Sequence, residues 1–466
     1  MLIGGRVQRA TACILAAVAG IGLAAVVIDV PPGLAGPAQD EVQHLLGRGE
    51  NPFPVHLTRP ADVPLSAMAQ LGQKIFYDPS LSASGQQSCS SCHSPDRFYG
   101  PVGSAPAVMG GKTMSLQGVR AVPSLMYLER QPGFTVGPDS EENEDVTLAQ
   151  MVAQSQGAVR ATKTADNATQ TATNLVPQGG LFWDGRADTL QEQALGPMVN
   201  PLEMANADIG DVAKKLSRTS YAPLFGQLFG PAILQNPQQL VSEALFAVGR
   251  YEIEDTHFHP YTSKFDDWLE GKVRLDPAEM RGYVLFNDPA KANCAGCHLD
   301  SAATDGTPPL FTDHQFEALG APRNPDLVVN RDPHYFDLGV CGPVREDMQD
   351  QTPYCGMFLT PTLRNVASRS VFFHNGVFHT LQAVMDFYAF RDVAPEKVYP
   401  RGANGVVAKY NDIPARYFDN VDVADPPFDR KLGDQPAMTE QEEADIIAFL
   451  GTLTDGYKIP AATGSK

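Results

Sequence analysis

The chain has 466 residues, which is long enough to bury the cores of two domains. Its 54 acidic residues outnumber its 35 basic residues and give a formal net charge of −19. Such a field repels phosphate backbones, so it excludes nucleic acid as a partner and is compatible with a basic protein partner. With 41 glycines and 38 prolines, the chain is expected to be rich in loops.

The first 36 residues have the organisation of a segment that directs export. Arg6 and Arg9 precede an uncharged apolar run from Ala10 to Ile28, and Gly33-Leu34-Ala35 provides a small-x-small cleavage site. The apolar run is long for a signal peptide, so an uncleaved N-terminal membrane anchor is the alternative. Either segment places the rest of the chain outside the cytoplasm. We expect a periplasmic protein that begins with an N-terminal extension over residues 37–64.

One sequence module occurs twice in the chain. Its first copy, Gly72–Pro79, precedes Cys89–His93, and its second copy, Gly282–Pro289, precedes Cys294–His298. Both copies read G-x-x-[IL]-F-x-D-P followed by C-x-x-C-H, and they lie about 210 residues apart. The duplication predicts a first domain over residues 65–255, a second domain over residues 256–456 and a tail over residues 457–466.

The first domain contains a stretch of unusual composition at about residues 131–180. An acidic run is followed there by a tract from Ala161 to Asn174 that is rich in Thr, Ala, Asn and Gln and poor in apolar residues. Such a composition is typical of segments that do not form a packed core. We interpret this stretch as an inserted surface excursion and assign it no chemistry.

The second module and the C-terminal region carry helix signals. Asp276-Pro277-Ala278-Glu279 is a capping box with proline at the first helical position, and Pro289 ends this helix near Asn287. Thr439 and Glu442 form a further capping box, and apolar residues follow at helical spacing. No stretch shows sustained strand alternation with hairpin turns. The predicted fold is therefore all-α with much irregular loop.

C-x-x-C-H is the attachment signature of c-type haem. The two thiols add to the porphyrin vinyl groups, and the adjacent histidine lies below the ring and binds the iron. A dithiol redox site and half of a zinc site are the alternatives, and two copies inside matching modules of an exported protein disfavour both. We predict two cytochrome c-like domains, each around one covalently bound haem. The attachment residues and proximal ligands are Cys89, Cys92 and His93 in the first domain, and Cys294, Cys297 and His298 in the second.

Two further cysteines, Cys341 and Cys355, lie close together in the second half. In an oxidising compartment such a pair is typical of a disulfide that closes a loop. Two unrelated thiols would be the alternative, which is less common outside the cytoplasm. We therefore predict a Cys341–Cys355 disulfide.

The groups on the other face of each iron decide the function, because a six-coordinate haem transfers electrons whereas an open haem can bind peroxide. No histidine occurs between Ser94 and Trp183. Met109 and Met114, the thioethers early in this stretch, lie in a glycine-containing loop and are more typical of packing than of ligation. We expect the first haem to be open on its distal face.

Segments of both halves resemble the bacterial di-haem cytochrome c peroxidase and MauG superfamily. They are Phe182-Trp183-Asp184-Gly185-Arg186-Ala187, Gln193 and Glu203-Met204 in the first half, and Thr360-Pro361-Thr362-Leu363-Arg364-Asn365-Val366 and Phe373-His374-Asn375-Gly376 in the second. Together with two C-x-x-C-H motifs in order, the resemblance covers roughly residues 65 to 455, interrupted by the insertion. It implies a di-haem oxidoreductase that reacts with hydrogen peroxide.

By position, the resemblance implies roles for three residues of the first half. Trp183 would lie between the two haems and conduct electrons or holes. Gln193 and Glu203 would line the distal pocket of the first haem, where a carboxylate suits peroxide chemistry because O–O cleavage moves a proton between the two oxygens. From the residues alone, Trp183 reads as a core aromatic and Glu203 as a surface or capping carboxylate. These roles therefore rest on the resemblance.

In the family that this chain resembles, the sixth ligand of the second haem comes from the helix after the F-H-N-G segment. It is methionine in the cytochrome c peroxidases and tyrosine in MauG-type enzymes. The matching position here is Tyr388, and Met385 lies one helical turn earlier. A phenolate favours oxidised iron and lowers its potential, whereas a thioether raises it. Tyr388 is the predicted iron ligand, and it suits a second haem that shares oxidising equivalents with the first.

The resemblance also implies a calcium ion between the domains, held by an asparagine that precedes an A-P pair. The corresponding stretch is Arg120-Ala121-Val122-Pro123, so an alanine stands at that position. Backbone carbonyls near Arg369 and Val371 remain as candidate ligands. This departure puts calcium binding in doubt.

The predicted reaction is the reduction of hydrogen peroxide at the first haem, with electrons drawn through the second haem from a protein donor. That donor could itself be oxidatively modified, as in MauG-type enzymes. One alternative is a cytochrome c peroxidase supplied by a small electron carrier, such as a small cytochrome or a cupredoxin. A second alternative is a di-haem cytochrome that only transfers electrons.

Overall fold

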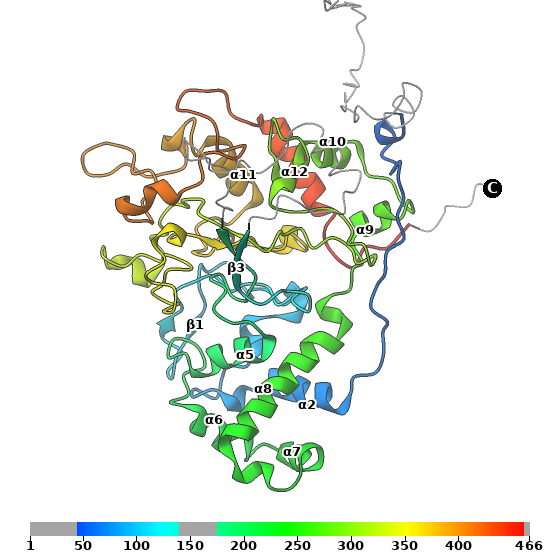
Figure 1. The fold of residues 1–466 in the computed structure, drawn as a ribbon, viewed down its shortest axis with the longest axis vertical. Coiled ribbons are helices and arrows are strands. Elements are labelled where there is room, and N and C mark those ends of the chain that lie inside the picture. The colour runs from blue at the N-terminus through cyan, green and yellow to red at the C-terminus, as the bar shows by residue number, and fades with distance from the viewer. Residues whose placement is uncertain (1–43, 139–174, 461–466) are drawn as a thin grey trace, which may run out of the picture.

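The computed structural model describes residues 44–138 and 175–460, arranged in two parts (Figure 1). One part contains α2 and α5 to α8, and the other contains α9 to α12. The predicted export segment, most of the predicted insertion and the end of the tail lie outside these residues. Within the described ranges, no helix is long and apolar enough to cross a membrane.

Helices provide most of the regular structure. In chain order they are α2 (Ala67–Phe76), α3 (Cys89–Cys92), α5 (Leu190–Val199), α6 (Ile209–Leu216), α7 (Ala222–Phe229), α8 (Pro237–Glu254), α9 (Lys264–Leu269), α10 (Pro277–Phe286), α11 (Leu381–Phe390) and α12 (Glu440–Gly451). Short 3-10 turns and long irregular connections join them. This helix-rich framework agrees with the expected fold class.

Small sheets, which the all-α expectation missed, also occur among the described residues. Three antiparallel pairs are formed, by β1 (Met109–Gly110) with β2 (Leu116–Gln117), by β3 (Thr135–Pro138) with β4 (Leu175–Gln178), and by β5 (Phe316–Glu317) with β6 (Phe358–Leu359). Their strands have two or four residues, which is too short to show a clear alternation of apolar and polar residues. The β3–β4 pair joins the two ends of the predicted insertion.

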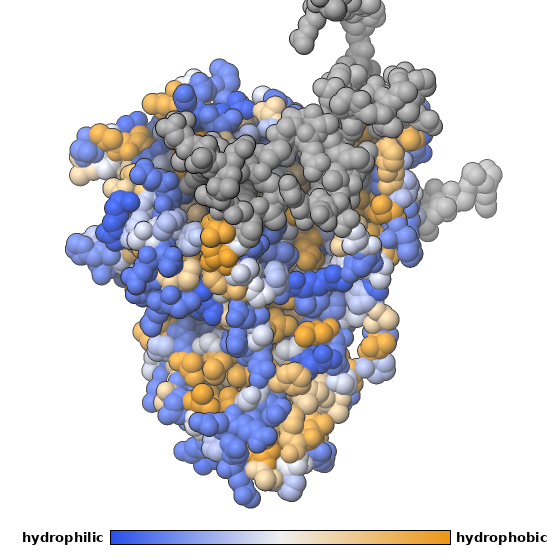
Figure 2. Space-filling view, in the orientation of Figure 1, coloured by the Kyte–Doolittle hydropathy of each residue, from blue (hydrophilic) through white to orange (hydrophobic). Residues whose placement is uncertain are grey.

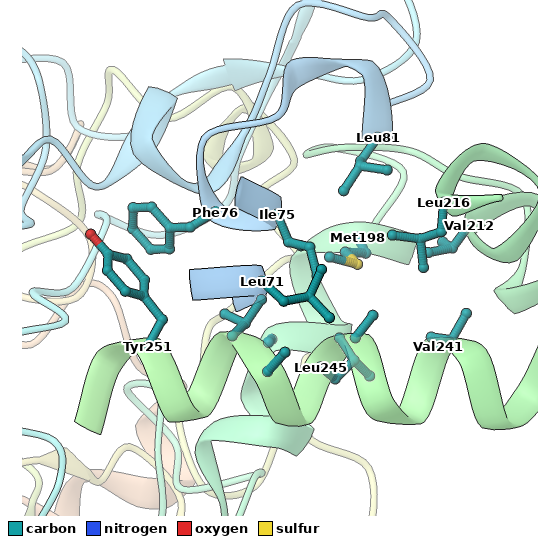
Figure 3. Close-up of a cluster of buried hydrophobic side chains, with 14 of the residues drawn as sticks. Leu71, Ile75, Phe76, Leu81, Met198, Val212, Leu216, Val241, Leu245 and Tyr251 are labelled. Carbon is teal, nitrogen blue, oxygen red and sulfur yellow. The ribbon is translucent and has the colours of Figure 1, made fainter. Parts of the chain in front are cut away.

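In the first part, α2 crosses α8 at very short range. Gly72 makes this crossing possible, because a Cβ atom at that position would lie 1.8 Å from the carbonyl oxygen of Ala247 on α8. Apolar side chains of the two helices then meet in a buried cluster that includes Leu71, Ile75, Leu245 and Tyr251 (Figure 3). Each large apolar side chain buried in this way contributes about 1.5–3 kcal/mol to folding.

The second part repeats this arrangement with α10 and α12. A Cβ atom at Gly282 on α10 would lie 1.9 Å from the carbonyl oxygen of Asp445 on α12. Gly72 and Gly282 are the first residues of the two copies of the module. The glycine of the repeated motif is therefore required by a close helix crossing that both halves share.

Both predicted capping boxes are confirmed. Asp276 and Glu279 cap the start of α10, and Thr439 and Glu442 cap the start of α12. Because these side chains satisfy backbone N–H groups that lack a partner within the helix, they fix where each helix begins. α10 ends at Phe286, close to the position predicted from Pro289.

The chain before α2 runs along the second part and only then enters the first (Figure 1). The backbone N–H of Val55 donates to the carbonyl oxygen of Leu269, and that of Thr58 donates to the carbonyl oxygen of Gly306. Arg59 forms an ion pair of 2.7 Å with Glu270. These contacts attach the N-terminal extension to the second part and help to hold the two parts together.

Hydrophilic residues cover most of the face shown in Figure 2, and apolar residues form separate smaller patches on it. This distribution fits the high content of acidic residues in the sequence. Most buried apolar side chains belong to two clusters, one in each part of the structure.

Candidate functional site

The first C-x-x-C-H motif forms one short helix, α3, that ends at His93. The carbonyl oxygen of Tyr99 accepts a hydrogen bond from Nδ1 of His93 at 3.1 Å. Burial lowers the pKa of His93 to about 4, so its imidazole is neutral at physiological pH. With its proton on Nδ1, the ring keeps the lone pair of Nε2 for a metal.

The second motif holds its histidine in the same way, although its first cysteine lies on a 3-10 turn, Cys294–Gly296, and not on an α-helix. The carbonyl oxygen of Phe311 accepts from Nδ1 of His298 at 2.9 Å, and burial lowers the pKa of His298 to about 4. Burial raises the pKa of Cys294 to about 12, as it does for Cys89 of the first motif. Both motifs therefore present protonated thiols and an oriented imidazole inside the protein.

The loop that supports each histidine is also duplicated. Oγ of Ser124 donates to the carbonyl oxygen of Phe98 at 3.0 Å, and Oγ1 of Thr362 donates to the carbonyl oxygen of Leu310 at 2.6 Å. Phe98 and Leu310 each precede the residue whose carbonyl holds the histidine. The tripeptides Pro123-Ser124-Leu125 and Pro361-Thr362-Leu363 are thus a further part of the repeat, which the comparison of the two modules missed.

A largely apolar cavity extends from the second motif to the interface between the two parts. Residues that line it include Cys294, Cys297, His298, Met385, Tyr388, His374, Leu125, Trp183 and Gln193. Two thiols and an imidazole with a free Nε2 therefore border an apolar space, which is what attachment of a c-type haem requires. The residues at the second motif fit this group, and the matching construction of the first motif fits a second one.

Trp183 connects the two parts of the chain. Its indole Nε1 donates to the carbonyl oxygen of Ala121 at 2.8 Å, and its own carbonyl oxygen accepts from the backbone N–H of Leu359 at 3.0 Å. Ala121 belongs to the first half and Leu359 to the second. These two hydrogen bonds hold the indole ring in the wall of the cavity. In the sequence, Trp183 lies between the two motifs.

Buried ion pairs hold the segment that carries Trp183. The fully buried carboxylate of Asp184 accepts from Arg120 at 2.6 Å and from Arg186 at 2.8 Å. Arg120 also donates two hydrogen bonds to Asp337 of the second half, at 2.6 and 2.7 Å. Removing one member of such a network leaves an unpaired buried charge, which is strongly destabilising. The network therefore fixes the Trp183 segment against both halves.

Glu203 lies beside the first motif. Its Oε1 accepts from Nδ2 of Asn200 at 2.7 Å, and burial raises its pKa against the opposing influence of Arg186. The pKa of Cys92 is raised to about 11, mainly by burial and to a smaller extent by the carboxylate of Glu203. The structure thus brings Glu203 close to the thiol of Cys92. Gln193, by contrast, lies on α5 in the wall of the cavity that contains the second motif.

Tyr388 lies on α11 beside the second pair of thiols. The pKa of its phenol is raised, mainly by burial and to a smaller extent by the thiols of Cys294 and Cys297. The ring stacks on Phe428 with a centroid distance of 5.3 Å. Met385 lines the same cavity from one turn earlier on α11. Both Tyr388 and Met385, the two candidate ligands on this helix, therefore reach the cavity.

The residues around Ala121 do not fit a calcium ion. The guanidinium group of Arg369 donates to the carbonyl oxygen of Val122 at 3.0 Å and to that of Val371 at 3.5 Å. Among the residues that the structure describes, no cluster of three or more His, Cys, Asp or Glu side chains could hold a metal ion. The carbonyls considered as calcium ligands thus face a buried positive charge that belongs to the chain itself.

Cys341 and Cys355 form a disulfide, with their Cα atoms 4.9 Å apart. The bond closes a loop between β5 and β6. A β-bridge between Gly339 and Met357 lies next to it. The disulfide therefore ties together the loop that leads into Phe358 and Leu359, two residues of the cavity wall.

Comparison with known proteins identifies relatives of the whole chain. A family model described as di-haem cytochrome c peroxidase matches residues 66–274. The methylamine utilization protein MauG of Paracoccus denitrificans is 30% identical over 88% of this chain and 93% of its own length. Cytochrome c551 peroxidase of Nitrosomonas europaea is 28% identical over 68% of this chain and 72% of its own length.

A solved structure gives a similar result. The diheme peroxidase BthA of Burkholderia thailandensis is 32% identical to this chain, with a TM-score of 0.71 over 88% of this chain and 94% of its own. A BthA variant in which a tyrosine is replaced by methionine matches equally well. The similarity therefore extends over most of both chains.

Proposed function

We propose, on the premise that this chain belongs to the di-haem cytochrome c peroxidase family, that it reduces hydrogen peroxide at its first haem site and receives electrons through its second. The chain is an oxidoreductase of the peroxidase type with two covalently bound c-type haems. A chemical difference between the two sites carries the proposal. A carboxylate, Glu203, lies near Cys92 of the first motif, and a phenol, Tyr388, lies near both thiols of the second.

We assign one haem to Cys89, Cys92 and His93, and the other to the equivalent residues of the second motif. When bound, haem iron supplies redox chemistry, with peroxide reduction at an open position and electron transfer at a six-coordinate one. Met109, a thioether that follows the first motif, is 46% exposed on β1. Its exposure supports a first site that is open on the distal face.

Glu203 is assigned to proton transfer at the first site. Because Oε1 accepts the hydrogen bond from Asn200, Oε2 is the oxygen that takes a proton from peroxide and returns it to the leaving oxygen. Burial raises the pKa of Glu203, and a carboxylate with a raised pKa accepts a proton more readily than an exposed one, which suits this role. Gln193 supplies an amide to the wall of the cavity that contains the second motif.

Trp183 and Tyr388 are assigned to electron transfer. Trp183 lies in the cavity wall and is hydrogen-bonded to both halves, and we assign its indole ring to carry electrons between the two sites. Tyr388 would hold the second haem iron through its phenolic oxygen. Burial alone disfavours the phenolate, but a bound cation reverses that preference. An anionic oxygen ligand lowers the potential of the iron, which favours sharing oxidising equivalents over accepting electrons from a small cytochrome.

A tyrosine ligand at the second haem favours an electron donor that is a protein and whose side chains are modified by the oxidation, as in a MauG-like enzyme. One protein named MauG, that of Paracoccus denitrificans, matches over 88% of this chain and supports the same choice. A peroxidase that uses a small cytochrome or cupredoxin is the second candidate, because other relatives are named cytochrome c peroxidases. In both cases the partners are hydrogen peroxide and an electron-donor protein.

The ligand assignment is tested with two variants of α11. Tyr388→Phe should change the low-spin spectrum of the second haem and leave the spectrum of the first unchanged, because only the phenolic oxygen is removed. Met385→Leu, one turn earlier in the same cavity wall, should leave both spectra as in the wild type. A spectrum that changes in Met385→Leu and not in Tyr388→Phe would make the thioether the ligand and refute the assignment.

The donor is tested by supplying peroxide together with either reduced cytochrome c or a candidate protein substrate. A MauG-like enzyme should oxidise the protein substrate, detected as a mass change, and turn over cytochrome c slowly. Rapid turnover of reduced cytochrome c without any modified protein would favour the second candidate.

We further infer the organisation and location of the chain from these assignments. The first haem site would belong to a domain over residues 65–255 and the second to a domain over residues 256–456. Covalent haem attachment and a disulfide in the second half support export to the periplasm. Fractionation of cells that express the full chain, with detection of the haem protein in each fraction, tests this location.

A further inference from the structure

Three tyrosines from separate segments meet beside the first motif. Tyr77 directly follows α2, Tyr99 lies in the loop after His93, and Tyr251 lies on α8. The hydroxyl oxygens of Tyr77 and Tyr251 are 3.5 Å apart, and their ring centroids are 6.4 Å apart. Tyr99 and Tyr251 both pack against the ring of Phe258, at centroid distances of 3.7 and 5.3 Å. The three tyrosines therefore belong to one aromatic cluster, and we call them the tyrosine row.

One end of this tyrosine row contacts the first haem site, and the other end reaches solvent. The carbonyl oxygen of Tyr99 accepts the hydrogen bond from Nδ1 of His93. Tyr99 and Tyr251 are 3% and 1% exposed, whereas the side chain of Tyr77 is 41% exposed. The row therefore leads from the proximal histidine to the surface through a buried region.

Phenylalanine rings surround the row. Tyr99 stacks on Phe258 with a centroid distance of 3.7 Å, and Phe76 packs edge-on against all three tyrosines at 5.2 to 6.0 Å. Figure 3 shows Tyr251 beside the ring of Phe76. Phenylalanine is not readily oxidised, whereas a phenol gives up an electron together with its proton. Within this aromatic cluster, the tyrosines are therefore the groups that can carry oxidising equivalents.

We propose that the tyrosine row is an electron path from the surface to the first haem site, and that Tyr77 oxidises small phenolic reductants. The proposal rests on the proposed reaction with peroxide, which supplies the oxidant. None of the three tyrosines lines the cavity described above that contains Trp183, so this path is separate from the one assigned to the protein donor. It would discharge the first site when no protein donor is bound.

Each electron is transferred in two steps, the oxidation of Tyr77 and its reduction by a phenol. Tyr77 loses one electron, which passes through Tyr251 and Tyr99 to the oxidised first haem site, and its hydroxyl proton goes to water because the side chain is exposed. A phenol in solution then transfers a hydrogen atom to the Tyr77 phenoxyl radical and restores the hydroxyl group. One hydrogen peroxide and two phenols thus give two waters and two phenoxyl radicals.

The buried members of the row explain why the exposed end is the site of release. Tyr251 and Tyr99 are buried, so neither hydroxyl group can release its proton directly to solvent. Each must pass its proton along the row when it is oxidised, and only Tyr77 can deliver a proton to bulk water. A neutral aromatic reductant can also approach the exposed ring of Tyr77 directly.

The experiment treats the holoprotein with peroxide in the absence of a protein donor and traps radicals with a nitroso spin trap. Peptide mass spectrometry then locates the adducts, and guaiacol serves as the phenolic reductant in parallel assays. In the wild type we expect a trap adduct at Tyr77. Tyr251→Phe should lose the Tyr77 adduct and guaiacol oxidation, although Tyr77 is intact, and the matched variant Tyr457→Phe should retain both.

The absorption spectrum of the haems separates the possible outcomes. A Tyr77 adduct that persists in Tyr251→Phe, or its absence in a wild-type protein whose haem spectrum responds to peroxide, would overturn the tyrosine row and leave the proposed function intact. If peroxide leaves the haem spectrum of the wild type unchanged, the proposed function is wrong and the tyrosine row is refuted with it.

Discussion

Glu203 combines burial near the first motif with a single fixed hydrogen bond from Asn200. Glu203→Gln keeps the size of the side chain and an oxygen for Asn200, but it cannot accept a proton. Because general acid–base groups typically contribute at least 100-fold, we predict a reaction with peroxide that is about 100-fold slower. Stopped-flow absorbance of the haem measures this rate. Glu346→Gln, which alters an exposed carboxylate, should react at the wild-type rate.

If Glu203→Gln also reacted at the wild-type rate, the carboxylate would have no part in the chemistry. A folded variant with intact haem spectra is needed for the comparison. The amide is close in shape to the carboxyl group, so we expect little loss of stability.

Arg369 occupies the carbonyl groups that a calcium ion would need. Its buried guanidinium group donates to Val122 and Val371, and burial lowers its pKa to about 10, which still leaves it charged at neutral pH. We predict that EDTA changes neither the haem spectra nor the rate of reaction with peroxide. Activity that is lost in EDTA and restored by added calcium would contradict this prediction.

Some residues of the site could be predicted from the sequence, and others could not. The cysteines and histidines of the two motifs follow from a local spacing that is the signature of covalent haem and that occurs twice in the chain. The contacts of Arg369 join segments almost 250 positions apart, so no local pattern could indicate them. The tyrosine row is assembled in the same way from three distant segments. Such contacts depend on the fold and become visible only in the structure.

At the scale of helices, the two glycines of the module permit the two closest crossings. We predict that Gly72→Ala and Gly282→Ala each destabilise the protein by about 3 kcal/mol, because an added Cβ must push two helices apart. Chemical denaturation measures this change. Gly226→Ala on α7, where the nearest atom is 4.0 Å from the added Cβ, should be neutral or stabilising.

Equal stabilities for all three alanine variants would show that the helices can move apart without cost. The close approach would then not explain the glycine in the repeated motif. A loss confined to Gly282→Ala would mean that the two halves differ in how tightly they pack.

The contact between α11 and α12 contains a buried carboxyl group, Glu443. It accepts a hydrogen bond from Gln382 at 2.5 Å, and burial, with Asp386 and Glu440 nearby, raises its pKa from 4.5 to about 7. Because the folded state binds this proton more tightly, the stabilisation is complete below pH 4.5 and is lost as the pH rises through about 7.

We predict that the Tm of the wild type falls over this pH range and that the fall is smaller in Glu443→Gln. Other buried carboxyl groups affect the Tm equally in both proteins. The difference between the two Tm profiles therefore reports on Glu443 alone. Calorimetry at several pH values measures it. Identical pH profiles would place the titration of Glu443 outside this range.

The elements themselves were predicted unevenly. Capping boxes at Asp276 and Thr439 marked two helix starts, because the caps are local and have a strong sequence signature. The short strand pairs escaped prediction. β5 and β6, for example, are held by segments about 40 residues apart and contain two residues each. Their pairing is set by the tertiary structure around the cavity.

At the scale of the whole molecule, a duplicated framework supports two different sites. The helix crossings, the supporting hydroxyl groups and the carbonyl acceptors of His93 and His298 are repeated in both halves. The groups added to this framework differ, with Glu203 near Cys92 of the first motif and Tyr388 near both thiols of the second. The repeat accounts for haem binding at both sites. The differences between its copies account for the proposed roles of the two sites, peroxide reduction at the first and electron transfer at the second.

The most direct test of this division is the EPR spectrum of the resting, oxidised holoprotein, recorded before and after addition of peroxide. We predict one high-spin ferric signal from the first haem and one low-spin signal from the second, with peroxide removing the high-spin signal first. Two low-spin signals that peroxide leaves unchanged would contradict the account, because neither iron would then have an open position.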